Sequence, residues 1–192
     1  MKAPEQQLKP KILPPTGMHV ARCYQVIDLG TQPNNFDPAR PKRLLKLVFE
    51  IDKTNDFGHG PQPFTISKEY PFTMAQYENK LSNLRLTINN WRGKSLSDEE
   101  AQNFDFTTLL NQFAFVNIVH KTSSSGKERA EIASISPLVN GITKFEPVNH
   151  AVCFSLDDFN QSVYERIDKY TQEKIAISPE YKFLNIVPVG NV

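Results

Sequence analysis

The sequence has few cysteines, no long apolar run and almost no excess of charge of either sign. Cys23 and Cys153 lie far apart and show no metal-ligand spacing, so we expect two ordinary thiols. No segment approaches the roughly eighteen apolar residues of a membrane span. The first residues, MKAPEQQLKPKILPP, have no apolar core for a signal peptide. These absences predict a cytoplasmic protein without a membrane partner.

The residue patterns of common enzyme sites are also missing. The four histidines follow no metal-binding spacing, and no nucleophile sits in an elbow motif. The acidic segments SLDDF and SDEE are typical of helix N-termini, where the helix dipole stabilises negative charge. We therefore expect no catalytic residue, no metal and no cofactor, although catalytic groups can converge from distant positions.

The segment TSSSGK resembles a nucleotide phosphate loop only superficially. A Walker loop needs glycine five residues before its Gly-Lys pair and Ser or Thr after it. Here Lys121 and Glu128 occupy those two positions, and a strand-like pattern follows where the motif requires a helix. The segment is predicted to be a hairpin turn between two strands, NQFAFVNIVHK and ERAEIASISPL.

Charge is distributed unevenly along the chain. Lys and Arg together number 22 and Asp and Glu 21, a net charge of +1. Counted along the sequence, the net charge is +3 over residues 1–70, zero over 71–140 and −2 over 141–192. Composition alone therefore indicates neither a nucleic-acid binder nor a membrane binder.

Alternating apolar and polar residues predict three strands in the N-terminal half, at HVARCYQVIDLG, RLLKLVFEID and PFTISKEYPF. The first strand is expected to be buried on much of both faces, with Val20, Tyr24 and Val26 opposite Ala21, Cys23 and Ile27. The second is expected to be half-buried, with Leu45, Leu47, Phe49 and Ile51 opposite Lys46, Val48 and Glu50.

Two later segments have helical periodicity. An apolar stripe at Tyr77, Leu81, Leu84, Ile88 and Trp91 predicts an amphipathic helix that ends at Gly93. Thr73 with Gln76 could form its capping box, and Ser97 with Glu100 predicts a second, shorter helix. Near the C-terminus, Phe159, Val163, Ile167 and Tyr170 predict one helix that begins near Ser155 and runs to about residue 177.

The order of elements predicts a mainly β fold: a five-stranded OB-fold-like barrel with a helix between strands three and four, followed by a C-terminal helical extension. Residues 1–16, which hold four prolines, are expected to form a flexible arm. Residues 17–140 would form the barrel domain, and residues 141–192 an extension whose helix packs on the barrel or on a second subunit.

In an OB-fold, the loops after strands one and four flank the face that binds single strands. Basic side chains can follow a phosphate backbone, and aromatic rings can stack on unpaired bases. The candidate residues are Phe36, Arg40, Lys42 and Arg43 in the first loop, Lys121, Lys127 and Arg129 in the hairpin, and Lys46, Lys68 and Tyr70 on strands. All could equally be solvated surface or, for the aromatic residues, core.

Several segments, taken together and in order, resemble the phage-encoded single-stranded DNA-binding proteins. They are VARCYQVIDLGTQ, SKEYPFTM, LSNLRLTINNWRGKSLSDEE, FDFTTLLNQFAFVNIVHKTSSSGK and EIASISPL, and the resemblance covers roughly residues 13–140. It implies an OB-fold that coats single-stranded DNA during phage replication or recombination in a bacterial host cell. Lys68 and Tyr70 fall in the matching "SK.Y" segment, and Lys121 and Lys127 fall in the matching hairpin.

Charge neutrality favours a competing hypothesis, in which the same barrel is a protein-interaction module. Such a module would dock a phage or host replication or recombination protein, and its basic loops would be merely solvated. The C-terminal segment LNIVPVGNV lacks the dense acidic tip that many single-strand-binding proteins use to recruit partners. A homodimer also remains open.

Overall fold

The structure, a computed structural model, describes residues 12–34, 37–56, 58 and 60–184. Its long strands are β1 (Gly17–Gln32), β2 (Lys42–Asp56), β3 (Pro61–Pro71), β6 (Phe113–Thr122) and β7 (Glu128–Pro137). The short strands are β4 (Gln76–Tyr77), β5 (Lys80–Leu81) and β8 (Val152–Phe154). The helices are α1 (Asn83–Arg92), α2 (Asp98–Gln102), the 3₁₀ turn η1 (Phe106–Leu109), α3 (Gln161–Tyr164), α4 (Lys169–Ala176) and α5 (Pro179–Phe183).

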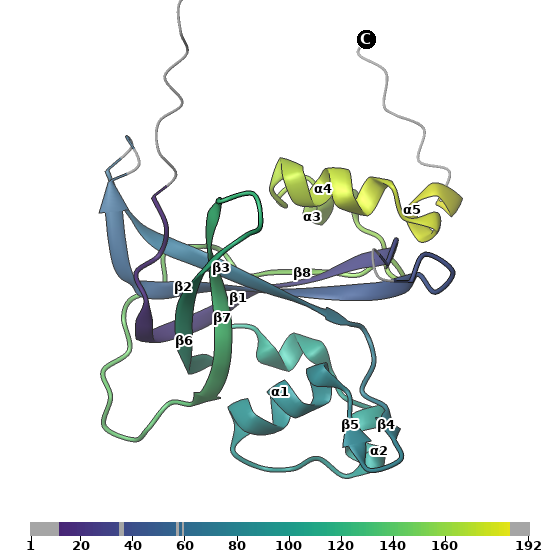
Figure 1. Cartoon of the computed structure of the whole chain (residues 1–192), viewed down its shortest axis with the longest axis horizontal. Helices are drawn as coiled ribbons and strands as arrows, with labels where there is room; N and C mark the ends of the chain where they lie inside the picture. The colour runs from purple at the N-terminus through teal and green to yellow at the C-terminus, as the bar shows by residue number, and fades with distance from the viewer. Residues whose placement is uncertain (1–11, 35–36, 57, 59, 185–192) are drawn as a thin grey trace, which may run out of the picture.

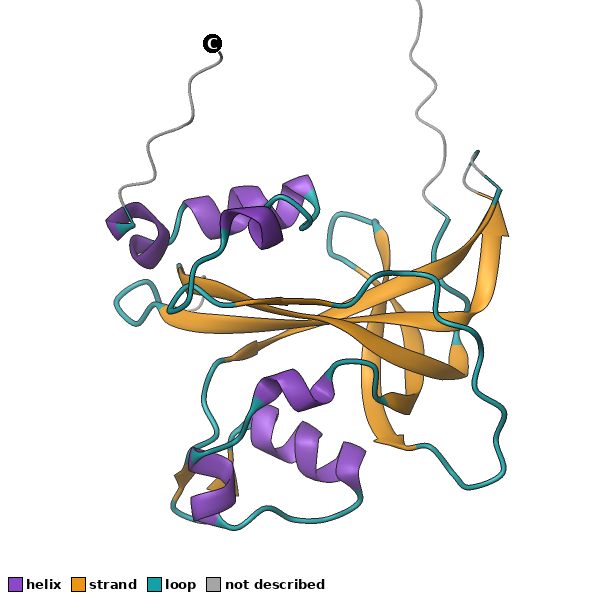
Figure 2. Cartoon of the chain, turned by 180° about the vertical axis from the view of Figure 1, so that it is seen from behind, coloured by secondary structure: helices purple, strands orange, loops and turns teal. Residues whose placement is uncertain are grey.

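One large sheet forms the centre of the molecule, with the strand order β3-β2-β1-β6-β7. All neighbours in this order are antiparallel, and β8 adds to β1 in parallel beside Gln25, Val26 and Ile27. Helices α1 and α2 lie on one side of the sheet with the β4–β5 hairpin, and α3, α4 and α5 lie on the other (Figures 1 and 2). The five predicted long strands are confirmed.

The expected mainly β architecture is confirmed, but the sheet is not a closed barrel. Strands β3 and β7 form no backbone ladder among the described residues. They approach each other where the Lys68 ammonium donates a hydrogen bond to the carbonyl of Ile132, with an N–O distance of 3.0 Å. A side chain therefore bridges the gap that backbone pairing would close.

Each face of the sheet has its own apolar core, so β1 is buried on both sides as expected. One core lies against α1 and includes Leu47, Phe49 and Trp91. The other lies under α3–α5 and includes Ile27, Val48 and Ile175. The predicted burial of one face of β2 is confirmed, but its other face is also covered, because the C-terminal extension packs on it.

The predicted assignment of β1 side chains to faces is confirmed at Tyr24 but wrong at Val26 and Ile27. Val26 joins Ala21 and Cys23 in the core on the α1 side, whereas Tyr24 and Ile27 belong to the core under the extension. The pairing of β1 with β2 shifts register between Cys23 and Gln25. A β-bulge of this kind inserts one residue and reverses the alternation beyond it.

The predicted helix from Thr73 is shorter than its apolar stripe. Residues 76–81 form the β4–β5 hairpin, whose turn contains Glu78 at φ 53°. Helix α1 starts only at its N-cap Ser82, whose Oγ accepts from the Arg85 N–H, and it ends at Gly93 in the left-handed conformation. The predicted stop at Gly93 and the capping box of Ser97 and Glu100 are confirmed.

The single helix predicted in the C-terminal extension is three short helices instead. The side chains of Asn160, Asp168 and Ser178 accept hydrogen bonds from backbone N–H groups at the starts of α3, α4 and α5. Each cap favours a new helix start, and Pro179 cannot donate a backbone hydrogen bond to a preceding turn.

Part of the predicted N-terminal arm contacts the sheet. Pro14 is buried, and its carbonyl lies 2.8 Å from Nε2 of His120, while the carbonyl of Pro15 lies 2.9 Å from Nε2 of His19. Residues 1–11 lie outside the described part. Within the described residues, no helix has the length and apolar character needed to cross a membrane.

Candidate nucleic-acid interface

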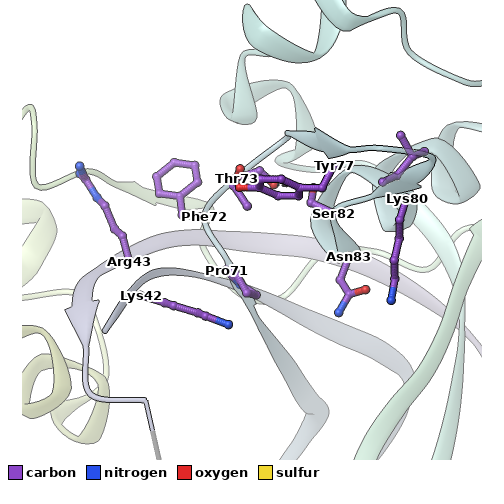
Figure 3. Close-up of a pocket in the computed structure, with 10 residues that line it drawn as sticks. Lys42, Arg43, Pro71, Phe72, Thr73, Tyr77, Lys80, Ser82 and Asn83 are labelled. Atoms are coloured by element: carbon purple, nitrogen blue, oxygen red, sulfur yellow. Dashed lines mark hydrogen bonds between the residues drawn. The ribbon is translucent and has the colours of Figure 1, made fainter. Parts of the chain in front are cut away.

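An open groove lies at the end of the sheet, where β2 begins and β3 ends against the β4–β5 hairpin. Its volume is about 590 Å³. It is lined by Lys42, Arg43, Pro71, Phe72, Thr73, Tyr77, Lys80, Leu81, Ser82 and Asn83 (Figure 3). We call it the basic groove, because three of these residues are cationic. Strand pairing fixes its base, since Leu44 at the start of β2 is paired with Pro71 at the end of β3.

The positive charge in the basic groove comes mainly from its two lysines. Lys42 and Lys80 are exposed, and neither forms an ion pair with a residue in the described ranges. They reach the groove from different elements, β2 and β5 (Figure 3). An anion between them would meet two unpaired ammonium groups.

Arg43 contributes a fixed guanidinium whose charge is already largely balanced. It donates to both carboxylate oxygens of buried Asp28, and its Nη2 lies 2.9 Å from the carboxylate of Asp157 in the C-terminal extension. Hydrogen bonding to Asp28 raises the pKa of Arg43 above its ordinary value. The guanidinium carbon also lies 5.7 Å from the centre of the Phe72 ring, so the side chain is held in one orientation.

Two aromatic rings border the basic groove. Tyr77 on β4 is 67% exposed, which leaves most of its surface available to a ligand. Phe72 is partly buried and meets the ring of Phe106 edge to face at 5.2 Å. Cations interleaved with accessible rings can hold both the phosphates and the bases of a single strand.

Two of the predicted strand residues face the interior. Tyr70 is only 2% exposed, and burial raises its pKa to about 12. The Lys68 ammonium lies 5.6 Å from the centre of that ring, and burial lowers the pKa of Lys68. A base could not stack on Tyr70 without displacing the elements that cover it, whereas Lys68 is partly exposed and its ammonium donates to the Ile132 carbonyl.

Lys46 is covered by the C-terminal extension. Its ammonium donates to Oγ1 of Thr171 at 2.6 Å and lies 3.7 Å from the carboxylate of Asp168, and its side chain is 12% exposed. The outer face of the sheet between the two predicted binding loops is thus occupied by α4.

The hairpin residues form a separate and largely neutralised group. Lys121 and Arg129 each lie 2.7 Å from the carboxylate of Glu131, whereas Lys127 at the turn is exposed and forms no ion pair with a described residue. Hydrogen bonding from Lys121 lowers the pKa of Glu131. The hairpin tip rises on the side of the sheet where α3–α5 lie, away from the β4–β5 hairpin (Figure 1).

The structure thus brings Lys42 and Arg43 together in the basic groove and separates them from the other predicted residues. Arg40 is an exposed loop residue, 3.5 Å from Asp37, and Phe36 lies outside the described residues. Sequence reasoning missed Tyr77 and Lys80, because Tyr77 fitted a helical stripe. The polar turn YENK between them was the available signal of a hairpin.

No known protein-family model matches the chain, and no curated protein sequence matches it either. Among the described residues, no three His, Cys, Asp or Glu side chains are grouped so that they could hold a metal ion. The resemblance to phage single-stranded DNA-binding proteins therefore remains a prediction from the sequence motifs, and the geometry of the basic groove is the main structural guide to function.

Proposed function

We propose that this protein binds single-stranded DNA without sequence preference and without catalysis, in phage DNA replication or recombination inside a bacterial host. The observation that carries the proposal is the basic groove, where unpaired Lys42 and Lys80 accompany the exposed ring of Tyr77. Lysines neutralise phosphates and release counterions, which supplies affinity that falls with salt. A ring that stacks on a base favours strands whose bases are unpaired.

We interpret the large sheet as a partly open OB-type fold. Strands β1, β2 and β3 form a meander, β1 also pairs with β6, and α1 lies between β3 and β6 in the chain. OB-folds usually bind oligonucleotides on the face of strands two and three. In this chain α4 covers that face at Lys46, which favours a binding path displaced to the basic groove at the sheet end.

The proposal is tested by reversing the two unpaired charges, in the variant Lys42→Glu/Lys80→Glu. Fluorescence anisotropy would follow a labelled oligonucleotide of about thirty nucleotides, longer than the 4–16-nucleotide site of one OB-fold. We expect at least tenfold weaker binding, and a salt dependence whose slope is smaller by about 0.7 for each phosphate that the protein no longer neutralises.

The matched control is Lys53→Glu/Lys182→Glu, which changes the net charge equally at two exposed sites outside the basic groove. It should bind almost as the unaltered chain does, and an unlabelled duplex should compete poorly. Equal affinity of both double variants would remove the basic groove from the interface. An unaltered chain that binds no single strand at low salt would end the proposal.

One observation favours the second candidate function, the docking of a phage or host replication protein. Tyr170 on α4, Ile177 at the C-terminal cap of α4, and Phe183 on α5 are 72%, 52% and 82% exposed. Tyr170 and Ile177 also border a shallow groove of about 530 Å³ beside Leu44. Sedimentation of the purified chain would show whether a second copy covers this patch, and Tyr170→Ser/Phe183→Ser should abolish any such dimer.

A further inference from the structure

A second groove of about 520 Å³ opens beside the basic groove. Phe72 and Thr73 line both grooves, so segment 72–76 forms a ridge between them. The far wall of the second groove comes from α2 and η1, which supply Ala101 and Phe106. A strand held in the basic groove would therefore pass directly along an adjoining hollow.

The walls of the second groove are apolar and aromatic. Phe72, Met74 and Phe106 are partly buried, so each keeps some surface accessible. The Phe106 ring is held edge to face between Phe72, at 5.2 Å, and Phe104, at 5.1 Å. Rings fixed in this way, with a polarisable thioether beside them, suit a flat aromatic ligand.

The floor of the groove carries a buried guanidinium that adds little net charge. Arg85 is 4% exposed, and its Nη1 donates to Asp98 at 2.6 Å while its Nη2 donates to the Leu96 carbonyl at 2.8 Å. Its Nε–H has no acceptor among the described residues. Because Asp98 balances the charge, the groove lacks the excess positive charge that would favour a phosphate.

Two exposed amides stand at the rim, Gln76 from β4 and Gln102 from α2. Nε2 of Gln76 donates to the Glu78 carbonyl at 2.9 Å, which leaves its amide oxygen available. An amide side chain can both donate and accept, so it can pair with the polar edge of any nucleobase. Aromatic walls, polar rims and a neutralised floor match a base better than a phosphate or an aliphatic side chain.

We infer that this second groove, the base groove, takes an unpaired nucleobase of a strand whose phosphates lie in the basic groove. The inference rests on the proposed function and adds a base site to it. Phosphate contacts in the basic groove would provide the part of the affinity that depends on salt. Contacts with the nucleobase in the base groove would provide the part that is lost when the base is removed.

The experiment compares two oligonucleotides of the same length, one normal and one with every base removed, on the unaltered chain and three double variants. The unaltered chain should bind the normal strand at least fivefold more tightly, since stacking contributes about that factor or more per base. Gln76→Ala/Gln102→Ala should weaken binding of the normal strand about threefold to tenfold, with unchanged binding of the abasic strand. Lys42→Glu/Lys80→Glu should weaken binding of both strands.

Gln62→Ala/Gln161→Ala is the matched control, because both side chains are exposed and neither lines either groove. If the lysine variant loses affinity while the Gln76/Gln102 variant binds both strands as the unaltered chain does, the base groove is wrong and the proposed function stands. If the unaltered chain binds neither strand, both fail.

Photocrosslinking supplies a readout that needs no variant. A strand carrying 5-iododeoxyuridine, irradiated on the unaltered chain, should attach at Met74 or Phe106, and mass spectrometry would locate the adduct. Attachment confined to Tyr77 would place the base in the basic groove and overturn the inference. A further outcome is a peptide that binds the chain tightly and prevents the adducts at Met74 and Phe106 while the chain still binds DNA with unchanged affinity. That result would assign the base groove to a protein side chain and overturn the inference.

Discussion

A carboxylate of the C-terminal extension forms an ion pair with an arginine that lines the basic groove. Asp157 is 73% exposed and lies 2.9 Å from Nη2 of Arg43, whose other bonds go to buried Asp28. A phosphate that accepts from Nη2 of Arg43 would compete with Asp157, because both are anions that accept from the same nitrogen. Asp157 therefore occupies the place of a ligand group.

Removing this carboxylate charge should strengthen DNA binding. We expect Asp157→Asn to raise affinity for single-stranded DNA about threefold to tenfold and to steepen its salt dependence, because Arg43 becomes available to a phosphate. Asp158→Asn is the control, since Asp158 is also exposed and forms no ion pair with a described residue. Affinities are measured by anisotropy titration. If Asp157→Asn and Asp158→Asn bind single-stranded DNA equally tightly, Asp157 does not compete with a phosphate for Arg43.

Among the elements, the last part of β1, at its register shift between Asp28 and Gly30, determines how closely the extension can approach. Gly30 has φ +67°, and a Cβ placed there would lie 2.5 Å from Cβ of Ser178 and 2.8 Å from Cδ1 of Leu156. Ser178 is fully buried and caps α5. Only glycine combines this backbone conformation with so close a contact.

We predict that Gly30→Ala loosens α4 and α5 from the sheet. A left-handed alanine costs about 1 kcal/mol, and the clash adds to that, so proteolysis within residues 157–184 should become faster. Gly141→Ala is the matched control, because φ is +86° there but no atom lies within 4 Å. Equal protease resistance of the two variants would mean that the close contact at Gly30 is not limiting.

Acid should release the same helices. Burial opposes ionisation of Asp168 and Glu180, but hydrogen bonds from Thr171 and from Thr31, respectively, outweigh it and lower the pKa of both carboxyls. Each carboxyl has a lower pKa when the helices are packed on the sheet than in the unfolded chain, where it is about 4. Its ionised form therefore stabilises the packed helices above about pH 4. This stabilisation is lost as the pH falls through the lower, folded-state pKa.

Hydrogen exchange, corrected for the change of the intrinsic exchange rate with pH, measures this loss. The amides of α4 and α5 should lose protection below about pH 4, before those of the central strands do. Glu180→Gln should shrink this pH-dependent part, since a neutral amide does not titrate. A protection profile that stays flat down to pH 3 in α4 and α5 would contradict the assignment.

Local signals predicted the elements unevenly. The capping box at Ser97 and the left-handed stop at Gly93 depend on neighbouring residues, so the sequence sufficed for both. The β4–β5 hairpin was missed because Tyr77 and Leu81 fit helical spacing, and that periodicity outweighed the turn signal of the segment YENK. Tyr77 and Lys80 were absent from the predicted interface for the same reason.

At the scale of the whole molecule, alternation predicted the long strands but not what covers them. Lys46, Val48 and Glu50 read as an exposed strand face, yet residues 148–184 lie over it. A helical stripe shows that an apolar face exists without naming its partner surface. This is why the sequence did not show that α4 covers Lys46, whereas Lys42 and Arg43, predicted as residues of the first loop, line the basic groove.

The buried network at Glu50 joins this cover to the sheet. Nε of Arg22 donates to Oε1 of Glu50 at 2.6 Å, and the Glu50 carboxylate also accepts from the backbone N–H of Asn149 at 2.9 Å. Arg22 and Glu50 are 2% and 0% exposed, so water solvates neither charge and each depends on its partner. One side chain thus connects β1, β2 and the start of the extension.

Glu50→Gln should lower the free energy of unfolding by about 3 kcal/mol, because it leaves the Arg22 charge buried without its counter-charge. Glu128→Gln, at an exposed carboxyl 3.6 Å from Nδ1 of His120, should change it by less than about 0.5 kcal/mol. Urea unfolding measures both values. Similar values for the two variants would mean that water reaches the Glu50 site.

One edge of β1 is completed by β8, a strand that the ribosome makes late. Strand β1 is paired with β6 only from Gly17 to Arg22, and β8 completes it at Gln25, Val26 and Ile27. A ribosome makes about 5–20 residues per second, so about 1.5–6 seconds separate the synthesis of β6 from that of β8, which form two ladders along the same edge of β1. During that interval each newborn chain carries an open strand edge that can pair with another chain. Crowded translation on one messenger is therefore where this protein is most exposed to misassembly.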